Sequence, residues 1–229
     1  MSELIKATED FVVHLFKDKL DSTFLYHNYT HTKRVYKSVN EIIANTTLSD
    51  EDILVLRLSA LLHDTGYTVS TENHEAESVK IATPFLSSKE VDNNIISRVA
   101  NCIMATKFDE QPSNKLGEII RDADASHFGK DYFLETSEFL KEEYKLQGLH
   151  NYSQKEWRDI NIKVMIEQHK YYSKYALDTW QPIKEKNLAG LILEKKKDKK
   201  KKNEEKLKAK VKSEAKSEDP ERGIQTSTG

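Results

Sequence analysis

The stretch Leu61-Leu62-His63-Asp64-Thr65-Gly66-Tyr67 joins an apolar run to two adjacent side chains of the kind that bind metals. Residues 53–62 are typical of a buried helix, and Gly66 interrupts the helical pattern. Burying a histidine and an aspartate without partners costs several kcal/mol, so a buried helix that ends on this pair needs a partner for it. A divalent cation would be such a partner. The stretch therefore predicts a metal site at the end of a core helix.

Further ligands for such a site occur upstream and downstream of this pair. His31 shares a helical face with Val35 and Val39, so we expect it to point toward the core. Asp124 ends an apolar segment near residue 120. Two imidazoles and two carboxylates suit Mn, Fe, Co, Ni, Zn or, less readily, Mg. Four ligands leave positions of an octahedral ion open to water and substrate, which is the arrangement of a metal-dependent hydrolase.

The fold class follows from the scarcity of helix breakers. Only seven Gly and four Pro occur in 229 residues, and alternating strand-like runs are few, so we predict an all-α fold. The expected helix boundaries are a cap at Thr8, a second helix ending near residue 44, a capping box at Ser49–Asp52, helix starts at Asn73 and Ser88, a segment over 116–125, another over 128–146, and a capping box at Ser153–Glu156 that opens one long helix to about Trp180.

Composition divides the chain into two domains or regions. Residues 191–229 carry 13 basic and 8 acidic side chains, which leaves 23 basic and 30 acidic side chains in 1–190. We therefore predict a compact multi-helix domain over 1–190, followed by a Lys/Glu-rich linker or tail over 191–229, poorly ordered or helical. An acidic domain is a poor binder of nucleic acid, so we expect no specific nucleic-acid partner.

The chain shows no sign of export. It has one cysteine, Cys102, so an intramolecular disulfide cannot form and a reducing compartment is expected. The N-terminus lacks an apolar signal-peptide region, and no window reaches the roughly 18 apolar residues of a membrane span. We expect a cytoplasmic protein.

Four short motifs together resemble one family. Residues 26–31 (YHNYTH) are similar to a YHNxxH element shared with cyclic-nucleotide phosphodiesterases, residues 61–67 to LLHDxGY, residues 73–78 (NHEAES) to NHExxS, and residues 122–126 (DADAS) to DADLS with Ala125 in place of leucine. All four belong to the HD-domain superfamily of metal-dependent phosphohydrolases, whose signature H…HD…D here reads His31, His63-Asp64 and Asp124. The resemblance covers about residues 8–190, and four motifs in order are far more specific than one.

The resemblance implies a role for each matching position. His31, His63, Asp64 and Asp124 take the places of the metal ligands, and Asp64 is also expected to be catalytic. His27 takes the place of the histidine that protonates the leaving oxygen, a role that suits an imidazole near neutral pH. The remaining expectations concern His74 as a second-metal or phosphate contact, Lys107 as a cation near substrate phosphates, and Asp122, which competes with Asp124 but is assigned a supporting place behind the ligands.

The same residues also allow other roles. His27 could cap a helix or bind a carboxylate, and His74 could be a surface histidine. The expected activity is hydrolysis of phosphomonoester or phosphodiester bonds, with a phosphorylated small molecule, a nucleotide, as the substrate. The alternatives are a catalytically inactive nucleotide-binding sensor, which could be anchored to a membrane, and a helical interaction module with a structural metal.

A shorter resemblance lies at the C-terminal end. Residues 221–226 (ERGIQT) are similar to the start of the Pycsar-type transmembrane effector domain, which follows an HD domain in some bacterial proteins. The resemblance implies that this chain is the cytosolic part of a longer membrane protein. Contact with a membrane is then expected only through a missing C-terminal segment.

Overall fold

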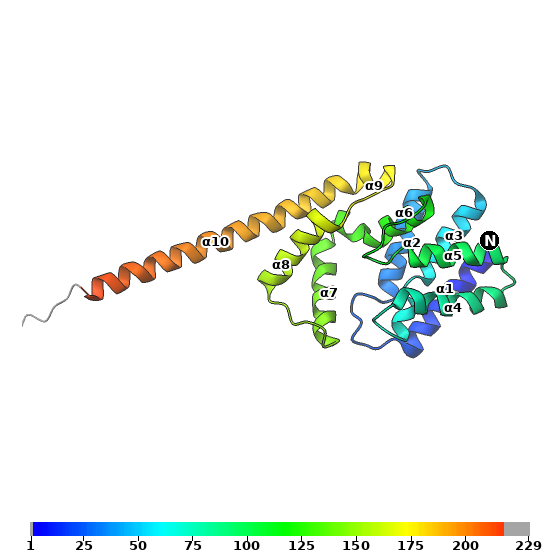
Figure 1. Cartoon of the computed structure of the whole chain (residues 1–229), viewed down its shortest axis with the longest axis horizontal. Coiled ribbons are helices and arrows are strands. Elements are labelled where there is room, and N and C mark those ends of the chain that lie inside the picture. Colours follow the sequence, from blue (N-terminus) through cyan, green and yellow to red (C-terminus); the bar gives the residue numbers. More distant parts are fainter. Residues whose placement is uncertain (1, 218–229) are drawn as a thin grey trace, which may run out of the picture. The chain divides into compact units, whose positions relative to one another are not determined.

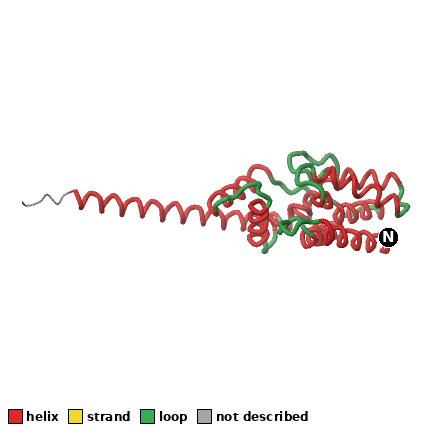
Figure 2. Tube along the Cα trace, turned by 90° about the horizontal axis from the view of Figure 1, so that it is seen from below, coloured by secondary structure: helices red, strands yellow, loops and turns green. Residues whose placement is uncertain are grey.

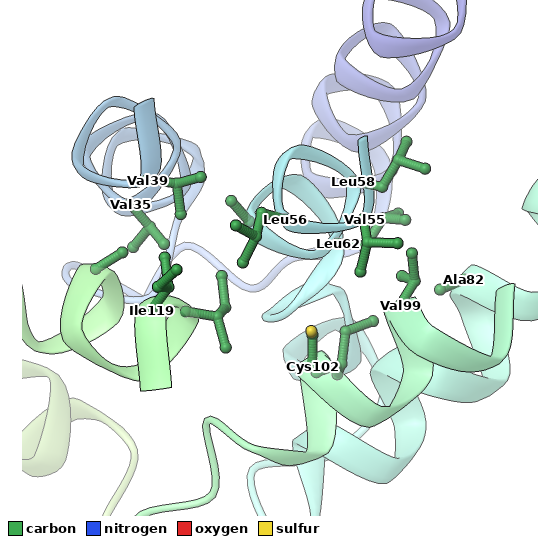
Figure 3. Packing of buried hydrophobic residues seen from close by; sticks show 14 of the residues in the cluster. Val35, Val39, Val55, Leu56, Leu58, Leu62, Ala82, Val99, Cys102 and Ile119 are labelled. Atoms are coloured by element: carbon green, nitrogen blue, oxygen red, sulfur yellow. The ribbon is translucent and has the colours of Figure 1, made fainter. Parts of the chain in front are cut away.

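Helix α3 (Asp50–Leu62) is the apolar helix that leads to His63, and it lies at the centre of the core. It packs against α1 (Ser2–Lys19), α2 (Tyr29–Ile43), α5 (Asn93–Met104) and α6 (Lys115–Asp124). Figure 3 shows apolar side chains on both sides of α3, with those of α2 and α6 on one side and those of α5 and α4 (His74–Ser88) on the other. A helix surrounded in this way must be apolar on all its faces, which explains its weak amphipathic pattern.

The computed structural model describes residues 2–217, and these contain helices and loops but no strand, as predicted (Figures 1 and 2). The remaining elements are η1 (Thr65–Thr68), η2 (Ala125–Gly129), α7 (Phe133–Leu146), α8 (Gln154–Lys163), the π-helical turn η3 (Val164–Gln168), α9 (Lys174–Thr179) and α10 (Gln181–Ser217).

Local capping signals predicted two helix starts correctly. Ser49 accepts a hydrogen bond from the Asp52 amide while Asp52 binds back to the Ser49 amide, and Ser153 and Glu156 form the same reciprocal pair before α8. Each box satisfies two of the amide groups that a helix N-terminus leaves without partners inside the helix.

Two other predicted helix starts were wrong. Helix α1 already begins at Ser2, and Thr8 is fully buried inside it, where its hydroxyl donates to the Leu4 carbonyl instead of capping a terminus. Ser88 is the last residue of α4, and Asp92 caps α5. Serine, threonine and aspartate favour caps, but a helix can bury or pass over them where packing demands it.

The single long helix expected from residue 154 to Trp180 is also wrong. The chain is helical to Lys163, forms the π-helical turn η3, and is extended at His169 before α9 begins. The break is stabilised by a tertiary contact, because the buried Asp122 carboxylate accepts hydrogen bonds from the amides of Tyr172 and Ser173. Those amides would be bonded within the helix if it were continuous.

The chain divides into two units, one up to Leu188 and one from Ala189 onward, close to the predicted boundary after residue 190. The Lys/Glu-rich segment is helical as far as Ser217, and every residue from Leu193 to Lys210 is exposed. Within residues 2–217 no helix has both the length and the apolarity needed to cross a bilayer. Residues 221–226, which carry the second resemblance, lie outside the described residues.

We predict that Leu58→Ala will lower the free energy of unfolding by about 2–5 kcal/mol, because Leu58 is fully buried and its loss leaves a cavity in the core. Urea unfolding followed by circular dichroism measures this. Leu134→Ala is the control, since Leu134 is 56% exposed, and it should change stability by less than about 0.5 kcal/mol. Equal effects of the two substitutions would contradict the central place of α3.

Candidate metal centre

The end of α3 presents a histidine whose orientation is fixed by the backbone. His63 is fully buried, and its Nδ1 donates to the Ala60 carbonyl at 3.0 Å. This bond places the proton on Nδ1 and leaves the lone pair of Nε2 free, which is how proteins orient a histidine that binds a metal. Asp64 follows and is also buried.

Two further helices supply the facing side chains. Asn28 caps α2 by accepting from the Thr30 amide, so His31 lies in the first turn of α2 and is 5% exposed. Asp124 is the last residue of α6. Three helix ends therefore converge, and each brings one or two of the predicted ligands.

The ligand atoms lie within coordination range of a common point. Nε2 of His31 is 3.3 Å from Nε2 of His63 and 3.0 Å from Oδ1 of Asp124, and all the ligand atoms of these three residues lie within 4.8 Å of one another. Oδ2 of Asp64 is 3.3 Å from Nε2 of His31 and 3.2 Å from Nε2 of His63. The structure thus brings together the four side chains that the sequence suggested as metal ligands.

One buried atom of this cluster lacks a hydrogen bond. Oδ2 of Asp64 is inaccessible to solvent and accepts no hydrogen bond from any described residue. Its nearest polar atoms are the Nε2 atoms of His63 and His31, at 3.2 and 3.3 Å. A buried carboxylate oxygen without a hydrogen bond is costly, and a cation shared with these nitrogens would compensate it. The donor set of two nitrogens and two carboxylate oxygens fits a divalent first-row metal or Mg²⁺.

The electrostatics of the cluster also favour a cation. Burial disfavours the charged form of each group, but the charges of His63 and His31 hold the pKa of Asp64 below its usual range. In the same way Asp64 and Asp124 raise the pKa of His63 well above its usual range against the effect of burial. Two carboxylates at this depth attract positive charge strongly, and a metal ion can take the place of the proton.

His27 lies beside the cluster but not on α2, which begins two residues later at Tyr29. Its Nδ1 donates to Oε1 of Glu143 at 2.5 Å, and the amides of Tyr26 and His27 both donate to Oε2 of the same carboxylate. Burial lowers the pKa of His27, but the hydrogen bond and charge of Glu143 outweigh it, so the pKa is raised. This bond also leaves Nε2 of His27 as the nitrogen available to a substrate.

Glu143 was missed by sequence reasoning. It lies on α7 and is buried, 116 residues along the chain from His27. In the sequence it is one of several glutamates in residues 135–143, and no spacing or motif distinguishes it from its neighbours. Only the tertiary contact identifies it.

His74 lies on a second side of Asp64, where its Nε2 is 3.7 Å from Oδ1 of Asp64 and 3.4 Å from Oε1 of Glu75. Its ring stacks on Tyr67, which also stacks on His27. Glu75 is buried and was not singled out by the sequence. The two oxygens of Asp64 thus face different partners.

A close backbone contact holds His74 in this place. The Gly66 amide donates to the Ser78 hydroxyl, and a Cβ added to Gly66 would lie 1.9 Å from the His74 carbonyl oxygen. Helix α4 therefore packs directly on the turn after Asp64. This explains why glycine follows the His-Asp pair and why a serine lies four residues after His74.

The two remaining predicted residues lie outside the cluster. The Lys107 ammonium pairs with Glu110 at 2.8 Å, on the loop after α5. Asp122 is fully buried and binds the backbone at Tyr172 and Ser173; burial raises its pKa to about 6. It supports the site by anchoring a loop and is not placed as a ligand.

Comparison with known proteins gives one match. The family model named HD domain matches residues 28–129, a span that contains His31, His63, Asp64 and Asp124. No curated protein and no solved structure matches the chain.

We predict that Gly66→Ala will lower the free energy of unfolding by about 1–3 kcal/mol, because the new methyl group would push α4 away from Asp64. Chemical unfolding of the purified variant measures the change. Gly190→Ala is the matched control, since a Cβ there meets nothing within 4 Å, and it should be neutral or slightly stabilising. A Gly66→Ala protein as stable as the parent would show that the contact is not tight.

Proposed function

Because this chain belongs to the HD-domain superfamily, we propose that it is a metal-dependent hydrolase of phosphomonoester or phosphodiester bonds in nucleotides. The observation that carries the proposal is the cluster of two histidines and two aspartates, buried except for the half-buried Asp124, with an Asp64 oxygen that accepts no hydrogen bond from the described residues, next to a histidine that is paired with a buried glutamate. The first part suits a cation, and the second suits proton transfer.

His31, His63, Asp64 and Asp124 are the residues that would hold the metal, with Mn, Fe, Co, Ni, Zn and Mg as the candidates. When bound, a divalent cation acidifies water and polarises phosphoryl oxygens. The protein fixes the ligands in advance, because His63 is oriented by the Ala60 carbonyl and Asp64 is held by the chain turn at Gly66. Such preorganisation removes the cost of arranging the ligands during the reaction.

His27 is the residue we assign to the leaving group. Its Nδ1–H is engaged by Glu143, so the proton that can be given to a departing oxygen is the one on Nε2. The raised pKa of His27 increases its protonated fraction near neutral pH. Glu143 orients the ring and stabilises its charged form, as a carboxylate does for a catalytic histidine.

A second candidate function is a nucleotide-binding sensor without turnover. The separate lysine-rich helical unit from Ala189 onward favours it, because such a unit can transmit binding to another molecule. Contact with a membrane would require a segment beyond the described residues. Stabilisation of the protein by nucleotides in the absence of product would support this candidate.

We predict that the purified protein retains a divalent metal and turns over nucleotides, cyclic nucleotides or guanosine alarmones when Mn²⁺, Ni²⁺, Co²⁺ or Mg²⁺ is supplied, and that Asp64→Ala abolishes both properties. Mass spectrometry determines the metal, and chromatographic separation of products detects ring opening as well as phosphate release. Asp178→Ala is the control, because Asp178 is exposed and pairs with the exposed Lys174. Full metal content and rate in Asp64→Ala would refute the proposal.

We predict that Glu143→Gln will lower the pKa of His27 and move the alkaline limb of kcat to lower pH. Protonated His27 is the active form, so turnover falls as pH rises through its pKa, and the Glu143 carboxylate raises that pKa. His27→Ala should keep the metal and lose about 10²–10⁴-fold in kcat. The control Glu138→Gln, on the exposed side of α7, should leave the profile unchanged. A reduced kcat with an unshifted alkaline limb would assign Glu143 a structural role only.

A further inference from the structure

Arg121 on α6 holds the loop that follows α5. Its Nη1 donates to the carbonyls of Ala105, Lys107 and Glu110, at 3.2, 2.6 and 2.6 Å, and its Nη2 donates to the carbonyl of Phe108. One guanidinium thus satisfies four carbonyls of a loop that has no regular structure of its own. The planar fork of arginine is suited to this, whereas a lysine could not reach four acceptors.

The next residue, Asp122, holds a second loop. Its carboxylate accepts from the amides of Tyr172 and Ser173. The two loops are then joined directly, because the Tyr172 hydroxyl donates to Oε1 of Gln111 at 2.8 Å. Two consecutive side chains therefore fasten two loops that lie far apart in the sequence.

This pair of loops is tied to the metal centre by α6 itself. Arg121 lies three residues before Asp124, so both side chains project from the same side of the helix. The Lys107 ammonium pairs with Glu110 at 2.8 Å within the same loop. The loop from Ala105 to Gln111 is therefore bound to α6 about one helical turn before Asp124.

The loop exposes two side chains whose chemistry matches a nucleotide. Phe108 is 55% exposed although Arg121 fixes its backbone, and Lys107 is next to it. An aromatic ring held on a rigid backbone can stack on a nucleobase with little loss of conformational freedom, and an ammonium pairs with a phosphate. A phosphorylated sugar without a base would use only the second of these contacts.

We propose that the loop from Ala105 to Gln111 is the nucleotide-recognition element of this protein, in which Phe108 stacks on the base, Lys107 contacts a phosphate oxygen, and Arg121 is the positioning residue that fixes both relative to Asp124. The inference rests on the proposed function, since it names residues that would recognise the nucleotide at the same site. The phosphate contact of Lys107 was expected from the resemblance, whereas the base contact of Phe108 and the positioning role of Arg121 lie outside the four motifs and the metal ligands.

The test compares Phe108→Ala with the unchanged protein on nucleoside monophosphates and on ribose 5-phosphate, which has no base, using the Mn²⁺-loaded enzyme. Phe108→Ala should raise KM for nucleotides about 10-fold with kcat within about 2-fold, and leave KM for ribose 5-phosphate unchanged. Phe108→Tyr keeps the ring and should restore KM. Leu134→Ala, at 56% exposure, is the control for loss of an exposed apolar side chain and should change nothing.

Arg121→Gln tests the positioning role. It should raise KM for both classes of substrate, because the whole loop loses its anchor, while metal content and the metal-dependent kcat at saturation stay within about 2-fold. The KM of Arg121→Lys should lie between that of the unchanged protein and that of Arg121→Gln. If Arg121→Gln lost its metal as well as raising KM, Arg121 would be stabilising α6 rather than the loop. That result would overturn the proposal.

The outcomes also separate this inference from the proposed function. If Phe108→Ala hydrolyses nucleotides with the same KM as the unchanged protein, the proposal of a recognition loop is refuted. The proposal that the protein is a hydrolase is then unaffected. If no compound is turned over, the dissociation constants of the same nucleotides, measured by calorimetry with Mn²⁺ present, replace KM. An unchanged constant in Phe108→Ala, or no binding at all, then overturns the proposal.

Discussion

The whole arrangement depends on the burial of Asp64. Asp64 is 4% exposed and lies where α2 begins and where α3 and α6 end, and one of its carboxylate oxygens has no hydrogen bond to any described residue. A protein tolerates such an atom only where something repays its desolvation. The rest of the site follows from this constraint: His31 and His63 must face it, Asp124 must approach from a third helix, and the chain must turn at once through Gly66 so that α4 can close over it.

The core explains how these groups can be held so closely. Helix α3 is covered on its different sides by α1, α2, α5 and α6 (Figure 3). Because its apolar residues are buried among these helices, the positions of His63 and Asp64 at its end are fixed. The second support is α6, whose last turn contains Arg121, Asp122 and Asp124. Arg121 binds the loop after α5, Asp122 binds the loop at Tyr172 and Ser173, and Asp124 is one of the four candidate ligands. A small rotation of α6 would therefore disturb both loops and the candidate metal centre together.

The sequence predicted those parts in which local chemistry decides the structure. The four candidate ligands, which the structure brings close together, were selected because metal-type residues in an otherwise apolar context are unusual. The boxes at Ser49 and Ser153 were predicted because a cap is a contact within four residues. It failed where a distant residue decides. Nothing near residue 170 reveals that Asp122 binds the amides of Tyr172 and Ser173, and nothing near residue 143 reveals that Glu143 binds His27. Thr8 failed for a related reason, since packing buries it inside a helix that starts earlier.

The residues matched by the family model are not the same as the residues that we assign to the site. The HD-domain match spans 28–129 and includes every proposed metal ligand, but His27 lies just before it and Glu143, Tyr172 and Ser173 lie beyond it. The candidate metal ligands and the groups around them are thus separate in the sequence, although they meet in space. A related chain can keep the four ligand positions and change His27, Glu143 or the loop contacts independently. Each of these groups is attached to the rest of the site through only a few hydrogen bonds. In this chain the His27–Glu143 pair is present: the buried Glu143 carboxylate accepts hydrogen bonds from Nδ1 and the amide of His27 and from the amide of Tyr26, which fixes the ring and backbone of His27 as the proposed proton transfer requires.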